Sequence, residues 1–550
     1  MIGVAAAEAD RSAVQEFFEL FKTPWEFYRP EGEYRVLICS DHEVPPTSAE
    51  LILLYGNRRT AFDREQQINA AVDRPSILRF RRSTIPLYKG CVCFAEASGG
   101  AVANNAAGAA VAVVHRSDSQ DIIRIGYDLF GEVQHVLAQG QPSEWASAAT
   151  VDEHIAMVRE LIVERGIPIV EIPPMPHGYD FVACLTHDID HPFLRRHCWD
   201  HTMFGFLYRA TIGSFFDVCR GKKSAGQLFT NWKAAALLPF VYGRRRDDPW
   251  EQFDRYLELE GDLASTFFVL PYKGDAGVAP DGRTSPKRAA GYAASDIAVD
   301  LRKLAAAGRE IALHGINAWQ DASRACAERG AVQQASGVRV EGTRMHWLYF
   351  APESPAKLQE AGFSYDSTVG FNETIGYRAG TTQVYKPSGA YLLLELPLHI
   401  MDTALFYRSY MDLSQAQASE AVRPLLENAS RRGGVLTVNW HDRSLGPERL
   451  WGPAYEELLA ELRRRKPWFA TAGQAVSWFR KRRAASFCSV KQRSGTVHVK
   501  LSVPDARDDL PPLRVRVHNA TSRERQDSVA AAPVFEDFVA DSLDLVLVAA

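Results

Sequence analysis

Between residues 176 and 484, short apolar runs alternate with stretches of helical spacing, and this alternation constrains the fold more than any other feature. It is typical of β-strand and α-helix units built around a parallel sheet. Polar side chains end or follow the strand-like runs: Asp188, His314, Arg344, His346, His399 and His441. Because the carboxyl ends of the strands of a parallel β/α barrel meet on one face, we expect these side chains to converge there. The sequence therefore predicts an α/β protein whose central (β/α) barrel carries an active site.

Two further regions flank the predicted barrel. Residues 1–175 mix short apolar runs with a helical pattern, which predicts an N-terminal α/β domain without a motif that indicates its role. Residues 485–550 contain short alternating segments such as TVHVKLSV and LRVRVHN, which predict a small β-rich C-terminal module. We therefore expect three domains, with the barrel at 176–484 in the middle.

Composition excludes several classes of protein. The chain has 550 residues, of which 46% are apolar, and its 63 basic and 67 acidic residues leave a formal charge of -4, so a nucleic-acid-binding role is not expected. No apolar run reaches the roughly 18 residues of a membrane span. The first residues do not form a signal peptide, and the eight cysteines are scattered, which together predict a cytoplasmic protein with reduced thiols.

The most informative motif is Leu185-Thr186-His187-Asp188-Ile189-Asp190. Residues two apart on a strand point the same way, so Asp188 and Asp190 present two carboxylates to one side. Two like charges this close are costly unless a cation or a proton intervenes. One solution gives one carboxylate to a divalent metal and leaves the other as a general base. Some glycosyltransferases also use D-x-D to hold a metal and a nucleotide, but no Gly-rich phosphate loop precedes the motif here.

A wider set of motifs carries a family resemblance. In chain order these are FVACLTHDID, ASTFFVL, EIALHG, GTRMHWLYF, GFSYDSTVGF, GYRAGT, LELPLHIMDT and VNWHD. Over roughly 300 residues the chain thereby resembles the polysaccharide deacetylase (NodB-homology) family, also grouped as carbohydrate esterase family 4. The resemblance implies a distorted (β/α) barrel that removes N- or O-linked acetyl groups from a carbohydrate with the help of a divalent metal.

The same resemblance implies roles for individual residues. Asp188 corresponds to the catalytic base, and Arg344 to the arginine that orients it. Asp190 and His314 correspond to metal ligands, and His441 to the histidine that protonates the leaving group. Zinc suits such a histidine and carboxylate set, and cobalt, nickel or manganese use similar ligands.

The chain departs from the family at one metal ligand. The family has a second histidine four residues after the first, and this chain has Ala318 there, with Asn317 beside it. His346 follows Arg344 by two residues, at a position where the family has proline, and we hypothesise that His346 supplies the missing ligand. The alternatives are that water or Asn317 completes the metal shell, or that the barrel is inactive and serves as a glycan-binding or scaffold protein.

Two other features have more than one interpretation. Tryptophans beside the motifs are candidates for stacking on sugar rings, although core packing explains them equally well: Trp319, Trp347 and Trp440. The segment 202–241 is apolar with interspersed basic residues. It is expected to be a helical insertion that packs over the barrel, and peripheral contact with a membrane or with a lipid-linked substrate is the alternative.

Overall fold

The structure is a computed structural model, and it forms two compact units. It describes residues 1–40, 44–73, 76–95, 100–117, 120–493, 496–503, 509–518, 535–540 and 544–548. The first unit comprises Met1–Gly178, Ala379–Thr381 and Trp478–Ala550, and the second comprises Tyr179–Arg378 and Thr382–Ser477.

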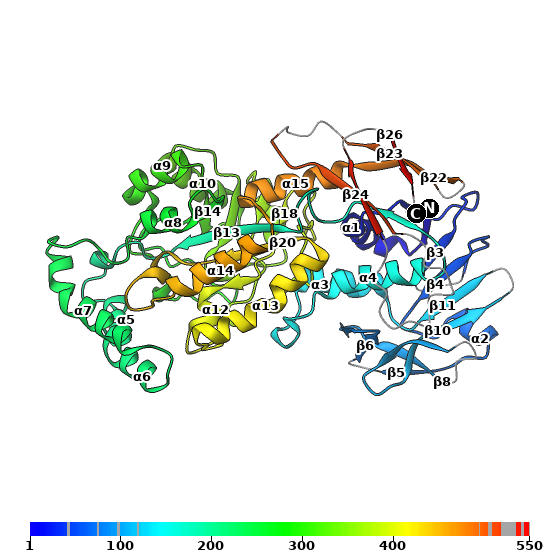
Figure 1. Ribbon diagram of the computed structural model, residues 1–550, viewed down its shortest axis with the longest axis horizontal. Helices are drawn as coiled ribbons and strands as arrows, with labels where there is room; N and C mark the ends of the chain where they lie inside the picture. Colours follow the sequence, from blue (N-terminus) through cyan, green and yellow to red (C-terminus); the bar gives the residue numbers. More distant parts are fainter. Residues whose placement is uncertain are drawn as a thin grey trace. The chain divides into compact units, whose positions relative to one another are not determined.

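The second unit is built on a parallel sheet that curls into a half-barrel (Figure 1). In spatial order its strands are β18 (Leu394–Glu395), β17 (Tyr365–Asp366), β16 (Gly342–Met345), β15 (Glu310–Gly315), β14 (Ser265–Val269), β13 (Val182–Ile189), β20 (Val435–Asn439) and β19 (Ile400–Met401). A ninth strand, β21 (Trp468–Phe469), also pairs with β13. The predicted parallel α/β architecture of this region is therefore confirmed.

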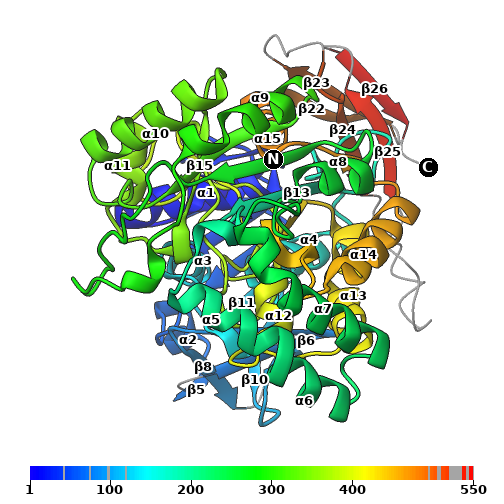
Figure 2. The same cartoon turned by 90° about the vertical axis from the view of Figure 1, so that its left-hand side faces the viewer.

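Helices cover the sheet and explain why its central strands are apolar. Every residue of β13, β14 and β20 is buried, as expected for parallel strands covered on both faces. The helices of this unit that flank the strands are α8 (Phe253–Glu260), α9 (Ala298–Ala306), α10 (Ala322–Ser336), α11 (Ser354–Glu360), α12 (Asp402–Phe406), α13 (Gln415–Arg432) and α14 (Gly452–Arg464). Figure 2 shows several of them, including α9, α10 and α14, arranged around the sheet.

The sheet differs from a closed barrel at its edge strands. Within 179–477, all of which the structure describes, β18 and β19 end the hydrogen-bonded order and do not pair with each other. Both strands, and β17 as well, are only two residues long, so they offer few backbone groups for a ladder. The expectation of a barrel is therefore refined to a half-barrel.

A helical insertion follows β13. It consists of α5 (His201–Tyr208), a π-helical turn (Arg209–Gly213), α6 (Ser214–Cys219) and α7 (Ala225–Tyr242). Its inner side packs Met203, Phe206, Ala210 and Leu238 against Leu194 and Trp250. The segment predicted to be a helical insertion is thus helical, and part of it is anchored on the second unit.

The first unit contains a mixed sheet and two small antiparallel sheets. The mixed sheet contains β1 (Ile2–Ala5), β2 (Trp25–Phe27), β3 (Val36–Ser40), β4 (Leu51–Tyr55), β5 (Asn69–Asp73), β6 (Ser76–Phe80), β7 (Ser83–Leu87), β8 (Cys91–Ala95), β9 (Ala101–Asn105), β10 (Ala110–Arg116) and β11 (Asp121–Ile125). The small sheets are β12 (Ile169–Glu171) with β24 (Leu513–His518) and β25 (Phe535–Ala540), and β22 (Ser486–Arg493) with β23 (Thr496–Ser502) and β26 (Asp544–Val548). Its helices are α1 (Arg11–Phe21), α2 (Ala61–Glu65), α3 (Leu129–Gln139) and α4 (Thr150–Val163), while α15 (Ala472–Ala484) begins in the second unit and ends in the first.

Among the described residues, no helix combines the length and the apolar character that crossing a bilayer requires.

Candidate metal centre and active site

The carboxyl ends of the central strands surround a cavity of about 380 Å³ in the second unit. Strand register explains the convergence, because Thr186 on β13 is opposite Asn439 on β20 and His314 on β15 is opposite Arg344 on β16. The sequence-predicted residues that line the cavity are Asp188, Asp190, His314, His346, Trp347 and His441.

Asp188 lies on β13 and has a hydrogen-bond donor on each carboxylate oxygen. Arg344 Nη1 donates to Oδ1 at 2.9 Å, and Asn439 Nδ2 donates to Oδ2 at 2.8 Å. Arg344 is itself fully buried and also donates to Thr186 Oγ1 at 2.8 Å and to the Ser367 carbonyl at 3.0 Å. These contacts fix the orientation of the Asp188 carboxylate.

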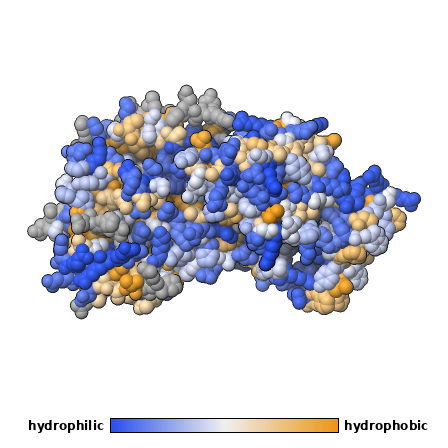
Figure 3. All heavy atoms as spheres, turned by 180° about the vertical axis from the view of Figure 1, so that it is seen from behind, coloured by the Kyte–Doolittle hydropathy of each residue, from blue (hydrophilic) through white to orange (hydrophobic). Residues whose placement is uncertain are grey.

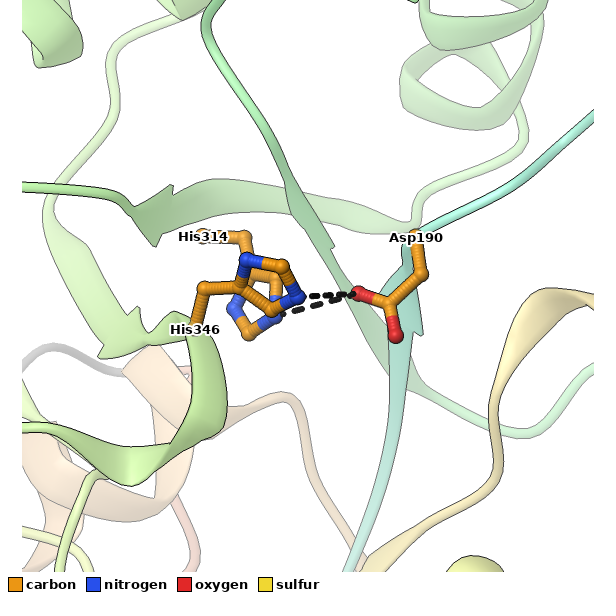
Figure 4. A group of neighbouring side chains, drawn as sticks. All are labelled: Asp190, His314 and His346. Atoms are coloured by element: carbon orange, nitrogen blue, oxygen red, sulfur yellow. Dashed lines mark ion pairs between the residues drawn. The ribbon is translucent and has the colours of Figure 1, made fainter. Parts of the chain in front are cut away.

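Asp190, one residue beyond the end of β13, faces imidazoles instead. Oδ1 lies 3.4 Å from His314 Nε2 and 3.5 Å from His346 Nε2, and Figure 4 shows both rings directed at this one oxygen. His314 Nδ1 lies 2.9 Å from the Arg344 carbonyl oxygen, which as acceptor requires the proton on Nδ1. With Nδ1 engaged in this way, Nε2 is the ring nitrogen of His314 that faces Asp190.

These three residues form a possible metal-binding triad. One ligand atom from each of Asp190, His314 and His346 lies within 4.8 Å of the others. Ligands bound tetrahedrally at about 2.1 Å are about 3.4 Å apart, which matches the two separations from Asp190 Oδ1. Asp190 Oδ1 is buried and has no hydrogen-bond partner among the described residues. The donor set therefore fits a divalent cation, and position 318, a buried alanine, contributes no ligand.

The two carboxyls are both held in their charged form. Burial would raise the pKa of Asp188, but Arg344 and neighbouring imidazoles outweigh burial and bring its pKa below the ordinary value. Burial would likewise raise the pKa of Asp190, and the imidazoles around it lower that pKa well below the ordinary value. Asp188 can therefore accept a proton, and Asp190 can bind a cation.

His441 follows β20 and is paired with a carboxylate on its far side. His441 Nδ1 lies 2.6 Å from Asp402 Oδ1, while His441 Nε2 faces the cavity 3.8 Å from Asp190 Oδ2. Burial lowers the pKa of His441, but Asp402 and the other nearby carboxylates raise it to about 10. At neutral pH the imidazole therefore carries a proton that it can donate into the cavity.

A cationic wall lies elsewhere in the same cavity. Arg209 from the π-helical turn, Arg443 and Lys287 all line the cavity. Arg209 Nε and Nη2 are buried without a hydrogen-bond partner among the described residues. The cavity therefore combines an acidic end, at the carboxylates, with a basic wall.

The candidate sugar-stacking tryptophans occupy different environments. Trp347 is 37% exposed and lines the cavity, whereas Trp319 and Trp440 are 9% and 1% exposed and do not. Trp440 packs on Tyr455 with ring centroids 5.2 Å apart. His399 lies outside the cavity lining, where its Nδ1 accepts a hydrogen bond from the Thr437 backbone N–H. Of these residues, only Trp347 can touch a ligand in the cavity.

Sequence reasoning singled out neither Asp402 nor Asn439, although both contact predicted site residues. Asp402 comes directly after the apolar run that ends at Met401, and Asn439 is the last residue of β20. The signal that identified the other site residues, a polar side chain at the end of an apolar strand, was therefore present for Asn439, whereas the strand before Asp402 is only two residues long.

Comparisons with known proteins give limited information. No family model and no curated protein sequence matches the chain. Among solved structures, it is similar to a protein assigned as a polysaccharide deacetylase from Mycobacterium smegmatis, with 21% identity and a TM-score of 0.35 over 56% of this chain and 94% of that one. It is also similar to Puue allantoinase, with 16% identity and a TM-score of 0.34 over 55% of this chain and 92% of that one. A third match is a CE4 family pseudoenzyme from Bacillus anthracis, with 10% identity and a TM-score of 0.24 over 42% and 61% of the two chains. These TM-scores are low, so the function has to be inferred from the geometry of the site.

Proposed function

We propose that this chain is a metal-dependent hydrolase that removes an acetyl group from an N-acetylated carbohydrate. The observation that carries the proposal is the meeting of three chemical functions in one cavity. These are a candidate metal triad, a carboxylate with fixed orientation and a protonated imidazole. Hydrolysis of an amide needs all three: activation of the carbonyl, a base for water and an acid for the leaving amine.

Asp190, His314 and His346 would hold the metal. When bound, a divalent metal such as zinc supplies Lewis-acid activation of the acyl carbonyl and of water. Three protein ligands and one open position are usual for catalytic zinc, and the triad offers three ligands without a residue at 318. We therefore propose that His346 replaces, as a metal ligand, the histidine that the polysaccharide deacetylase family has where this chain has Ala318.

The remaining steps belong to residues of the chain. Asp188, oriented by Arg344 and Asn439, accepts a proton from the attacking water as the new C–O bond forms. His441, protonated through its pairing with Asp402, donates a proton to the nitrogen as the C–N bond breaks. The products are acetate and a free amine. Trp347 is the aromatic surface on which a sugar ring can stack.

The direct test is acetate release from a panel of N-acetylated glycans, measured with native protein, after chelation, and after adding back zinc, cobalt, nickel or manganese. Activity that disappears on chelation and returns with one of these metals supports the proposal. Acetate release from O-acetyl esters alone would show that the activity is ester hydrolysis and not amide hydrolysis. Metal binding without any hydrolysis would favour an inactive glycan-binding barrel.

The role of His346 has its own test. His346→Ala should weaken zinc binding by at least about tenfold, because outer-shell changes alone commonly cost that much. His201→Ala is a matched control, since His201 also lines the cavity but lies outside the triad. Equal zinc affinity of His346→Ala and native protein would remove His346 from the proposed ligand set.

A further inference from the structure

The helical insertion after β13 exposes an unusual amount of apolar surface. Its large apolar side chains that are between 46% and 69% exposed are Phe204, Tyr208, Ile212, Phe215, Phe216, Phe229, Trp232 and Phe240, and Trp199 just before it is 78% exposed. Large contiguous apolar patches are rare on the water-exposed surfaces of monomeric proteins and mark interaction sites. Figure 3 shows hydrophobic residues gathered at the lower right, toward the end of the molecule that carries α6.

These side chains follow helical spacing. Phe204, Tyr208, Ile212 and Phe215 recur at intervals of four, four and three residues, so they lie along one face of the α5 to α6 segment. The opposite side of α5 is also apolar, and it is buried against Trp250. A helix that is apolar on two sides is normally buried on both, and here only one side is covered by the described part of the chain.

Helix α7 repeats the pattern. Phe229, Trp232 and Phe240 are exposed, whereas Leu238 and Val241 are buried. The exposed aromatic rings of α7 and of the α5 to α6 segment belong to one insertion, because α6 and α7 contact each other. The insertion therefore presents an aromatic-rich surface from two packed helical segments.

The charge of the insertion is opposite to that of the whole chain. Residues 201–248, the insertion and the six residues after it, contain eight Lys or Arg and three Asp, a surplus of five positive charges, whereas the full chain has a formal charge of -4. The basic residues that are exposed and form no ion pair in the described part of the chain are Arg220, Lys233, Arg244, Arg245 and Arg246. Exposed aromatic rings together with unpaired basic residues are typical of helices that lie in the interface of an anionic membrane.

We propose that the surface of α5, α6 and α7 docks the protein on an anionic phospholipid bilayer, without crossing it. The aromatic side chains enter the headgroup region, and the basic side chains contact lipid phosphates. A second copy of the chain is a poorer occupant. A two-fold symmetric contact would bring two surfaces with the same positive surplus together, and like charges oppose association.

The docking surface and the catalytic cavity share one structural segment. His201, Thr202 and Arg209, which belong to α5 and the turn after it, line the cavity. The outer side of this segment carries Phe204, Tyr208 and Ile212. The docking proposal does not depend on the reaction, and it can be tested without a substrate.

The test is co-sedimentation of the full chain with vesicles of phosphatidylcholine alone and of phosphatidylcholine mixed with phosphatidylglycerol. We expect binding to the anionic vesicles, little binding to the neutral ones, and weaker binding in high salt. Replacing Arg244, Arg245 and Arg246 together by Ser should weaken binding by about a hundredfold, because each basic residue near an anionic surface contributes about fivefold. The double variant Phe229→Ser with Trp232→Ser should weaken it by at least about tenfold.

Leu392→Ser is the matched control, since Leu392 is 70% exposed in the same unit but lies outside the insertion. Its vesicle binding should equal that of the native protein. The proposal is overturned if the native protein binds no vesicles, if it binds neutral and anionic vesicles equally, or if Leu392→Ser and the Phe229 and Trp232 variant lose binding to the same extent. A native dimer that becomes monomeric in that double variant, with no vesicle binding, would assign the surface to self-association instead.

Discussion

Asp188 and Asp190 are two residues apart, yet their surroundings are opposite in kind. Asp188 has one donor on each oxygen, from Arg344 and from Asn439. Asp190 Oδ1 has no hydrogen-bond partner in the described part of the chain, and it faces two imidazole Nε2 atoms instead. A carboxylate whose lone pairs are engaged by fixed donors is held in one orientation, whereas one that faces other ligand atoms is available to a cation. Identical side chains at one strand end are therefore placed in two environments, one suited to a base of fixed orientation and one suited to a metal ligand.

The largest effect is expected for Asp190→Asn. It removes the only carboxylate of the triad, so metal affinity should fall by more than about a hundredfold, beyond the loss typical of outer-shell changes. Turnover should be lost with the metal. Metal content measured by elemental analysis checks this, and a variant that retains the full metal content would contradict the ligand role.

Asp188→Asn should lower kcat by about 10²- to 10⁴-fold, the usual contribution of a general base, while metal content stays near that of the native protein. The amide keeps the size of the carboxylate, so Arg344 and Asn439 lose a charged acceptor but little packing. Equal metal loss in the Asp188 and Asp190 variants would abolish the distinction between the two carboxylates.

Arg344 pairs with Asp188 and not with Asp190, and it is therefore the main source of the difference between the surroundings of the two carboxylates. Arg344→Met leaves Asp188 buried without its cation, which should lower the free energy of unfolding by about 3–5 kcal/mol. Arg344→Lys retains the charge without the planar fork and should cost less. Denaturant unfolding of the three proteins measures the difference, and unfolding free energies that do not change would show that Asp188 needs no cation to remain charged.

A third carboxylate extends the comparison, because the donors to Glu328 among the residues that the structure describes are both backbone N–H groups. The N–H groups of Ile316 and Asn317 lie 2.8 and 2.7 Å from its oxygens, and burial raises its pKa to about 7 from 4.5. Below pH 4.5 the Glu328 carboxyl is protonated in both the folded and the unfolded chain. Between pH 4.5 and 7 it is ionised only in the unfolded chain. Native stability should therefore fall by about 3 kcal/mol in total as the pH rises from 4.5 to about 7, and no further above that, relative to Glu328→Gln. Parallel stability curves for the two proteins from pH 4 to about 8 would refute this.

The smallest effect is expected for Asp402→Asn, which changes the partner of the proposed acid His441 rather than Asp188 or Asp190. Loss of the Asp402 charge should lower the pKa of His441, so that the imidazole loses its proton at lower pH. The alkaline limb of the activity profile should move to lower pH, with about a tenfold to a hundredfold loss of kcat above neutrality. Metal content should not change. A pH profile identical to that of the native protein would exclude this role for Asp402.

The sequence predicted the parts of the site that depend on long buried strands. Asp188 and His314 lie on β13 and β15, whose apolar runs are readable, and the parallel order of the sheet brings their ends beside Arg344 on β16. His441 follows β20, another such run. For these residues, their position at the carboxyl end of a parallel strand was enough to predict that they would lie close together.

Other parts depend on local conformation that no periodicity reveals. Asp402 follows β19, a two-residue strand too short to show alternation. His346 begins a 3-10 turn in which Trp347 and Leu348 have φ values of 64° and 55°. Such left-handed backbone is uncommon for large side chains and depends on its surroundings in the fold. Trp440 shows the same limit, because its sequence neighbours give no sign that its ring packs in the core on Tyr455.

The pairing of β13 with β20 also governs when the site can exist. Asp188 and its partner Asn439 are 251 residues apart in the chain. At roughly 5–20 residues per second, a ribosome needs about 10 to 50 seconds to pass from the first to the second. During that interval β13 can pair with β14. Its other edge still lacks β20, and the Asp188 carboxylate still lacks Asn439. Assembly of the candidate active site is therefore a late event in biosynthesis, and a nascent chain stalled before residue 435 carries both carboxylates without the strand that completes their surroundings.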